Sequence, residues 1–220
     1  AIYAIACIVL VAWRRQAIAE VLRAAWTGFD AAARAAPRSA GAATLLLGLA
    51  ATAAWLPTMQ PDDVGYHLGL PWQLQEHARY AMDARQQVWA LAPWAGDVLQ
   101  GVAQVLAGRE ARGALNLLWL VATAWSLHAL ARALGGDAAR RWWAVAMAAS
   151  LPLTQHLLAG MQTELPAMAL LPLLALLVLR EDAAPPRLLL AGAVVFAGLT
   201  VFIALVALTV AKPMREGLLF

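Results

Sequence analysis

Two adjacent carboxylates, Asp62 and Asp63, lie just ahead of a tyrosine and a histidine, Tyr66 and His67. They follow an apolar run over residues 40–56, whose length is at the short end of what spans a bilayer. A carboxylate that is partly desolvated near a membrane surface has a raised pKa and becomes a useful general base. In an extended segment, neighbouring side chains point in opposite directions, so we expect one aspartate to face a given cavity. The simpler alternative is a solvated turn.

A second polar group lies between two apolar segments, where a short link contains Gln162 and Glu164. Glu164 starts an apolar segment, which is a costly place for a charge unless it has a partner or a task. Its simpler role would be to complement the positive end of a helix. The residues would also offer a ligand set rich in oxygen, of the kind that suits Mg²⁺ or Mn²⁺, although their spacing is not diagnostic of a metal. These ligands are Asp62, Asp63, Glu164 and His67.

The composition predicts a membrane protein. Hydrophobic residues make up 63% of the chain and charged residues 13%, which is about half the charged share of an ordinary soluble domain. A soluble protein of this size could not bury so much apolar surface, so we expect the lipid bilayer to be its solvent. The net charge is +3, but the arginines are scattered and form no stripe, which argues against nucleic acid as a partner. The single cysteine, Cys7, excludes an internal disulfide.

We expect an all-α fold, a polytopic bundle of about five or six membrane helices. The first apolar segment has 13 residues and would cover only about 20 Å, so we expect it to be the end of a helix that starts earlier. The domain organisation we expect is a truncated helix with a cytoplasmic loop over 1–39, a transmembrane module over 40–211 and a tail over 212–220. The expected membrane segments are 1–13, 40–57, 113–131, 142–159, 165–179 and 188–211.

The distribution of arginine predicts the orientation. Loops 14–39, 132–141 and 180–187 carry most of the arginines, and the positive-inside rule assigns such loops to the cytoplasm. The long loop 58–112 and the link 160–164 then fall on the outer side. The same topology places Lys212 and Arg215 outside, which disagrees with the rule.

The long outer loop is expected to contain two helices. One covers residues 70–82, and a clearer one begins at Pro93 with its apolar residues on one face and its polar residues opposite. Such helices lie in the membrane interface with tryptophan as an anchor, and they would form a lid over the bilayer. Ordinary amphipathic connectors are the alternative. The apolar positions are Trp94, Val98, Val102, Val105 and Leu106, and the anchors are Trp72, Trp89 and Trp94.

A family resemblance starts at the aspartate pair. Residues 61–71 resemble the first outer loop of bacterial membrane glycosyltransferases of the C superfamily, the dolichyl-phosphate-mannose and aminoarabinose transferase-like group. The matching residues are Pro61-Asp62-Asp63-x-x-Tyr66-His67-Leu68-x-Leu70-Pro71, and the acid-bearing link is Met161-Gln162-Thr163-Glu164-Leu165-Pro166-Ala167. The resemblance covers roughly residues 40–200, the N-terminal part of such an enzyme. The family usually has more helices, and the lysine-containing stretch expected after 188–211 is not recognisable.

The resemblance implies an inverting transferase in the bacterial inner membrane. It would move a sugar from a polyprenyl-phosphate carrier to an acceptor on the outer face. Asp62, four residues before the tyrosine, or its neighbour Asp63 would deprotonate the acceptor hydroxyl. Arg79, Arg85 or His67 would assist the departure of the lipid phosphate. Tyr66, Gln162 and Glu164 complete the expected substrate-binding residues.

Three other functions remain open. A lipid or sugar-lipid transporter would also show polytopic helices, but transporters usually carry polar or broken helices near the middle of the membrane in two related halves. A non-catalytic subunit of an envelope-assembly complex would share the same topology. A polysaccharide polymerase or ligase would be expected to show arginines as the leading feature of its outer loop.

Overall fold

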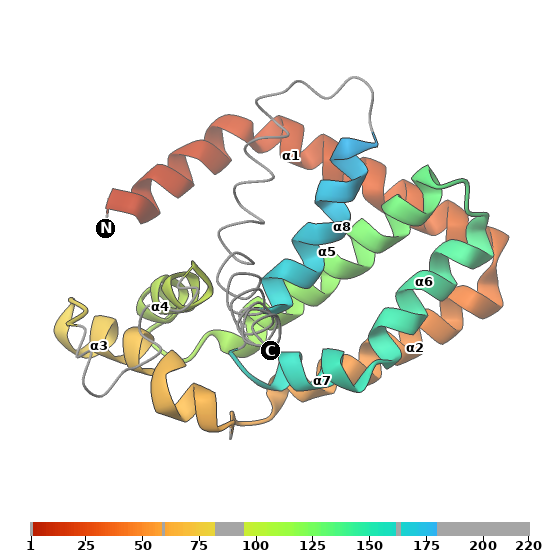
Figure 1. Ribbon diagram of the computed structural model, residues 1–220. Helices are drawn as coiled ribbons and strands as arrows, with labels where there is room; N and C mark the ends of the chain where they lie inside the picture. The colour runs from red at the N-terminus through yellow and green to blue at the C-terminus, as the bar shows by residue number, and fades with distance from the viewer. Residues whose placement is uncertain (1, 59, 82–94, 162–163, 180–220) are drawn as a thin grey trace, which may run out of the picture.

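The computed structural model describes residues 2–58, 60–81, 95–161 and 164–179, and within them every regular element is helical (Figure 1). The all-α expectation is therefore confirmed for these residues. The helices are α1 (Ile2–Ala35), α2 (Pro37–Thr52), α3 (Gly69–His77), α4 (Ala95–Ala107), α5 (Arg112–Ala133), α6 (Ala138–Ser150), α7 (Pro152–Ala159) and α8 (Glu164–Val178). A 3₁₀ turn, η1 (Ala53–Trp55), and a π-helical turn, η2 (Asp63–His67), follow α2.

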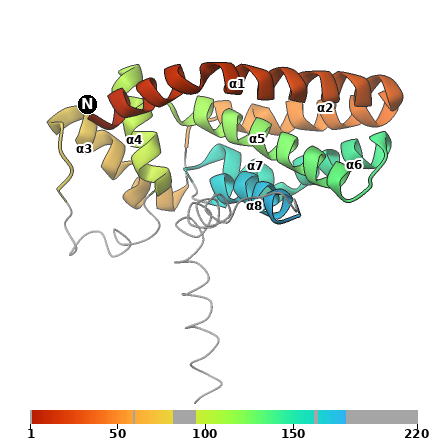
Figure 2. The ribbon, with the colours of Figure 1, turned by 90° about the horizontal axis from the view of Figure 1, so that it is seen from above.

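The first helix continues through the segment that was expected to be a cytoplasmic loop. Residues 14–35 are rich in alanine and arginine, which are strong helix formers, and they contain no proline. The helix ends before Pro37, because a residue that precedes proline is disfavoured in the helical region, and Ala36 has φ −141° and ψ 65°. Pro37 then occupies the first turn of α2. Figure 2 shows α2 running back along α1.

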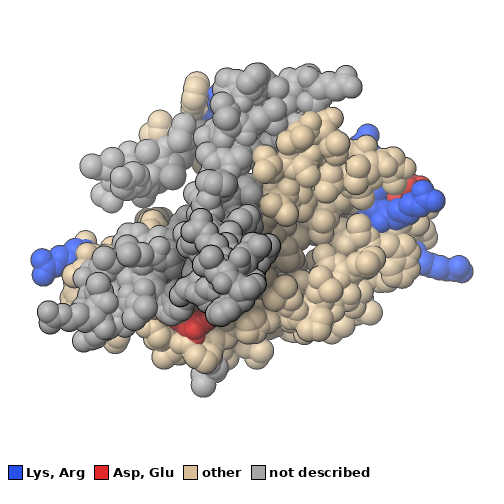
Figure 3. Space-filling view, in the orientation of Figure 1, with Lys and Arg blue, Asp and Glu red and all other residues tan. Residues whose placement is uncertain are grey.

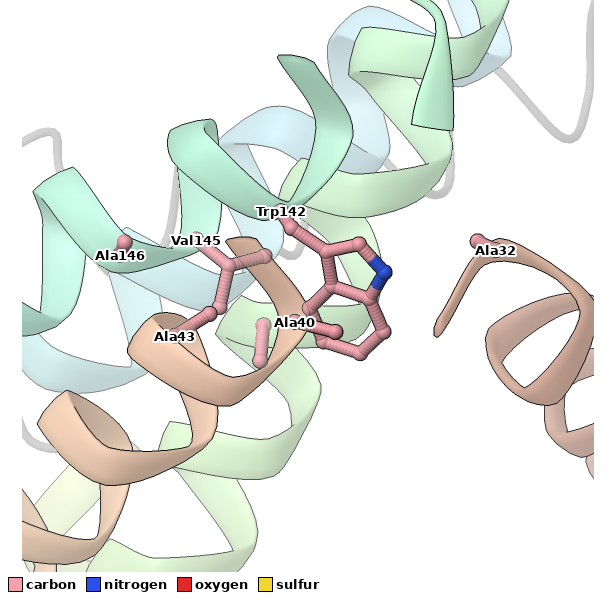
Figure 4. Packing of buried hydrophobic residues seen from close by; sticks show 7 residues of the cluster. Ala32, Ala40, Ala43, Trp142, Val145 and Ala146 are labelled. Carbon is pink, nitrogen blue, oxygen red and sulfur yellow. The ribbon is translucent and has the colours of Figure 1, made fainter. Parts of the chain in front are cut away.

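The first core cluster joins α1, α2, α5 and α6 (Figure 4). Small residues on α2, including Ala40 and Ala43, let α6 approach closely and bring Trp142 and Val145 against them. The rings of Phe29 and Trp142 lie 5.5 Å apart, within the range of favourable aromatic contact. This cluster fixes the end of the bundle at which α5 turns into α6.

The turn between α5 and α6 ends one helix and starts the next. Gly135 has φ +80°, a conformation that favours glycine, and the amide of Gly136 donates to the carbonyl of Ala131 at 2.8 Å. The Asp137 side chain then caps α6 by accepting from the amide of Arg140. Figure 3 shows Lys and Arg side chains gathered at the edge where α1 meets α2 and α5 meets α6.

The second core cluster lies at the other end of α5, where α2, η1, α7 and α8 meet. Leu158 and Leu165 are among its fully buried side chains. The start of α5 is pressed against η1, since a Cβ at Gly113 would lie 2.6 Å from the carbonyl oxygen of Ala54. This close packing brings Arg112 and the chain around it into the region of the aspartate pair.

The expected helix 142–159 is two helices in the structure, α6 and α7. Pro152 lacks an amide hydrogen and its ring is incompatible with the preceding turn, so the helix breaks at Leu151. The carbonyl of Ala148, which would have bonded to residue 152, accepts instead from the hydroxyl of Thr154 at 2.6 Å and from the amide of Leu151 at 3.4 Å. The break lets α7 change direction toward α8.

Helices α3 and α4 pack together beside the end of the bundle that carries α7 (Figure 1). They correspond to the two expected outer-loop helices, although Trp89, Pro93 and Trp94 lie outside the described residues. The polar face of α4 is the buried one: Asp97, Gln100 and Gln104 are at most 9% exposed, whereas Leu106 is 69% exposed. Gln104 donates to the side chain of Gln75 on α3, and Gln100 donates to that of Asn116 on α5.

The structure leaves the expected bundle of five or six membrane helices unconfirmed. Among the described residues, one helix, α5, is long and apolar enough to cross a membrane. Helix α8 is apolar but shorter than a full span. The expected segments 180–187, 188–211 and 212–220 lie outside the described residues.

Candidate active site

The aspartate pair lies in a helical turn and not in an extended segment. Asp62 precedes η2, and the carbonyl of Asp63 accepts from the amide of Leu68 at 2.9 Å, the five-residue spacing of a π turn. In this turn Asp63 and His67 point inward, while Asp62 remains exposed. One carboxylate of the pair is therefore buried and the other exposed, but this follows from a helical turn and not from the extended segment that was expected.

Asp63 is fully buried and its carboxylate is fully engaged. Both carboxylate oxygens lie 3.0 Å from the backbone nitrogen of Met161, and the hydroxyl of Thr58 donates to one of them. Met161 follows α7 in the chain, so this carboxylate connects the turn after α2 to the segment that precedes α8. Its contacts are those of a structural acceptor.

His67 forms a second buried contact, with Asp97 of α4. The imidazole Nδ1 lies 2.8 Å from a carboxylate oxygen of Asp97, and both side chains are almost completely buried. The ring of Tyr66 lies against that of His67, with 4.1 Å between centroids. Burial raises the pKa of Asp97, and its hydrogen bond with His67 opposes this shift. The bond to Asp97 leaves Nε2 as the remaining ring nitrogen.

Tyr66 is partly buried and lies against His67. Burial of the phenol raises its pKa to about 12, and Asp62, Asp97, Glu164 and Asp63 add to this shift in that order. These carboxylates come from the turn after α2, from helix α4 and from the start of α8. Direct contacts involve the sequence-predicted Asp63, Tyr66 and His67, whereas Asp62 and Glu164 act on Tyr66 through their charge.

Of the remaining sequence-predicted residues, the structure describes Arg79. Arg79 lies just past the end of α3 and is exposed. Gln162 and Arg85 lie outside the described residues. Among the described residues, no group of three or more His, Cys, Asp or Glu side chains could hold a metal ion, so the expected Mg²⁺ or Mn²⁺ ligands find no support there.

Three buried polar residues near the site were not predicted. Asp97 was assigned only to the polar face of an interfacial helix, and Arg112 and Asn116 were not considered for the site. Arg112 and Asn116 are 4% and 3% exposed and bind backbone carbonyls of α7 and the segment after it. The signal that could have identified them is their position at the start of a long apolar helix, where a charge or amide needs a partner.

A small pocket lies beside this group, between α4, α5 and the start of α8. Its walls include Leu99 and Gln100 from α4, Asn116 and Trp119 from α5, and Met161. Met161 is also the residue whose amide Asp63 binds, so the pocket and the buried carboxylate share a wall.

Comparison of the chain with known protein families, curated proteins and solved structures finds no match. The functional argument therefore depends on the residues of this chain and their arrangement.

Proposed function

We propose that this chain forms part of an inverting membrane glycosyltransferase that takes a sugar from a polyprenyl-phosphate carrier. The observation that carries the proposal is the exposed carboxylate of Asp62 at the start of the turn that contains Tyr66, next to the buried Asp63, which binds the segment before α8. A site with an accessible carboxylate and neighbouring hydrogen-bonding groups can activate a hydroxyl nucleophile. The resemblance of residues 61–71 to the outer loop of C-superfamily transferases points to the same chemistry.

The membrane part of the proposal rests on exposed apolar side chains. On α4 the polar residues face protein and the apolar residues face outward, the reverse of a helix in water. Large apolar residues such as Trp26, Leu45 and Leu118 are also more than 60% exposed on other helices. A polytopic arrangement in the bacterial inner membrane, with loop 58–112 on the outer side, would place these surfaces in lipid.

Within this proposal the two aspartates have different roles. The carboxylate of Asp63 already accepts hydrogen bonds from the amide of Met161 and the hydroxyl of Thr58. Asp62 makes no hydrogen bond or ion pair with the described residues and is exposed, so it is the general base. Its carboxylate takes the proton of the acceptor hydroxyl while the acceptor oxygen attacks the anomeric carbon. The bond from that carbon to the phosphate oxygen breaks, and the lipid phosphate leaves with the electron pair.

The other polar groups would bind the two substrates. The phenol of Tyr66, which keeps its proton well above neutral pH, would donate a hydrogen bond to the acceptor or sugar. Glu164 would accept a hydrogen bond from an acceptor hydroxyl. The four carboxylates make this region unfavourable for a phosphate, so the carrier phosphate would be held by a cationic group such as Arg79, or by Arg85, which lies outside the described residues.

The proposal is tested by sugar release from a panel of labelled polyprenyl-phosphate sugars, with the protein reconstituted in liposomes. Asp62→Asn should reduce turnover by about 10²–10⁴-fold, the usual contribution of a general base. Asp30→Asn, the same change on exposed α1, is the matched control and should leave turnover unchanged. Full activity of Asp62→Asn would exclude it as the base, whereas carrier binding without turnover by the wild-type protein would indicate a transporter or a non-catalytic subunit.

A further inference from the structure

The carbonyls at the C-terminal end of α7 accept hydrogen bonds from side chains of other segments. The last carbonyls of a helix have no partner within the helix and need one when they are buried. Gln60 donates to the carbonyl of His156 at 2.8 Å. Arg112 donates to the carbonyl of Ala159 at 2.8 Å, and Asn116 donates to that of Leu158 at 2.9 Å. The end of α7 is therefore capped by residues that are distant in the sequence.

The same side chains hold the segment after α7. The amide of Asn116 also donates to the carbonyl of Gly160 at 2.7 Å, and Asp63 accepts from the amide of the next residue, Met161. Gly160 lies so close to Gln60 that a Cβ there would come within 2.7 Å of three atoms of the glutamine amide. Residues 160 and 161 are thus fixed from both sides.

Arg112 extends this arrangement to the end of η1. Its guanidinium donates to the carbonyl of Leu56 and, through Nε, to the side chain of Glu110 at 2.7 Å. A single planar group thereby joins the chain after α2 to the end of α7. Its positive charge also lies at the negative end of the α7 dipole, which is the favourable place for a cation.

We infer that Arg112 and Asn116 are positioning residues for the proposed active site. They fix the end of α7, and with Asp63 they fix the segment that leads into α8. Glu164, the first residue of α8, comes three positions after Met161, so the anchoring of Met161 limits where Glu164 can lie relative to the turn that carries Asp62 and Tyr66. The inference rests on the proposed function in one respect, the assignment of Glu164 to acceptor binding.

This role predicts a specific kinetic signature. Loosening the segment should displace Glu164 more than Asp62, because Asp62 adjoins a turn that keeps its own backbone hydrogen bonds. Binding of the acceptor should weaken while the proton transfer at Asp62 is preserved. We expect Arg112→Lys and Asn116→Ser to raise the KM for the acceptor by about tenfold or more, with kcat changed by less than about threefold. Lysine keeps the charge, but it lacks the fork that reaches two carbonyls at once.

The matched control for Arg112 is Arg132, near the opposite end of the same helix. Arg132→Lys should leave both kinetic constants unchanged. A fall in kcat at constant KM for Arg112→Lys, or an equal rise in KM for Arg132→Lys, would overturn the inference. Arg112→Lys is preferred to removal of the charge because the more severe change risks unfolding the protein.

A second measurement tests the inference without any turnover. Cysteines introduced by Asp62→Cys and Glu164→Cys in a Cys7→Ser background should be joined efficiently by a short bifunctional reagent. Adding Arg112→Lys should lower the yield clearly, and adding Arg132→Lys should not. Equal yields with and without Arg112 would overturn the positioning role. Absence of sugar transfer by the wild-type protein would instead overturn the proposed function. In that case the cross-linking yields alone would decide whether Arg112 has the positioning role.

Discussion

Asp62 and Asp63 are chemically identical neighbours, and their surroundings give them different roles. Asp63 is fully buried and accepts hydrogen bonds from Met161 and Thr58. Asp63→Asn should lower the free energy of unfolding by about 1–3 kcal/mol, because one oxygen acceptor becomes a donor beside existing donors. Asp62→Asn, the matched control, should change it by less than about 0.5 kcal/mol. Thermal unfolding of the detergent-solubilised protein measures both, and equal effects would show that Asp63 is not the structural acceptor.

The ionisation of Tyr66 gives a second prediction for a single residue. Burial, followed by the charge of Asp62, raises the pKa of this phenol from its ordinary value of 10.0 to about 12. The folded protein therefore holds the phenolic proton more tightly than the unfolded chain does. The resulting stability is fully present below pH 10 and is lost as the pH rises toward 12. Alkaline titration followed by phenolate absorbance should show a tyrosine that ionises late, and this late step should be missing in Tyr66→Phe. If Tyr66→Phe instead loses a step that occurs at lower pH, the assignment is contradicted.

The sequence could reveal site residues that form a local pattern, but it could not reveal those that depend on contacts between distant segments. Asp62, Tyr66 and His67 form a local pattern that is visible within seven positions. Asp97 and Arg112 have no local pattern, because each is buried by a partner from another part of the chain, and only the packing of those parts determines the contact. A polar residue at the start of an apolar helix was the available clue to Arg112.

At the scale of the helices, the break between α6 and α7 depends on Thr154 as well as on Pro152. The proline removes the partner of the Ala148 carbonyl, and the fully buried Thr154 hydroxyl replaces it at 2.6 Å. Thr154→Val keeps the shape and removes the donor, so it should lower the free energy of unfolding by about 1–2 kcal/mol. Thr154→Ser keeps the hydroxyl and should retain most of this hydrogen-bonding contribution. Denaturation of the three proteins side by side measures the difference, and a Val variant as stable as wild type would contradict the role of the hydroxyl.

The helices themselves were only partly predictable. The helical spacing of apolar residues predicted α4, and continuous apolar runs predicted α5 and α8, close to their observed positions. The region 142–159 was expected as one helix because its apolar character is continuous, yet Pro152 supplied a local signal for the break. The segment 14–35 was expected as a loop on the basis of its arginines, but charge distribution predicts the side of a membrane and not the backbone conformation. Its alanine-rich composition was the better guide to α1.

At the scale of the whole molecule, the proposed site and the arginine-rich turn lie at opposite ends of α5. The helix has 22 residues and is therefore about 33 Å long, enough to cross the hydrocarbon core of a bilayer. Arg112 at its start belongs to the candidate site, and Arg132 at its other end adjoins the turn into α6. If α5 spans the membrane, these two ends lie on opposite faces.

Single cysteines can test this arrangement in intact cells. In a Cys7→Ser background, Val64→Cys would mark the turn after α2, and Leu134→Cys would mark the turn after α5; both positions are more than 60% exposed. We expect a membrane-impermeant maleimide to label position 64 and to label position 134 only after the membrane is permeabilised, because the arginine-rich end belongs in the cytoplasm. Labelling of both positions in intact cells would mean that α5 does not cross the bilayer. Labelling of position 134 alone would reverse the orientation and place the candidate site on the cytoplasmic face, where an outer-face acceptor could not reach Asp62.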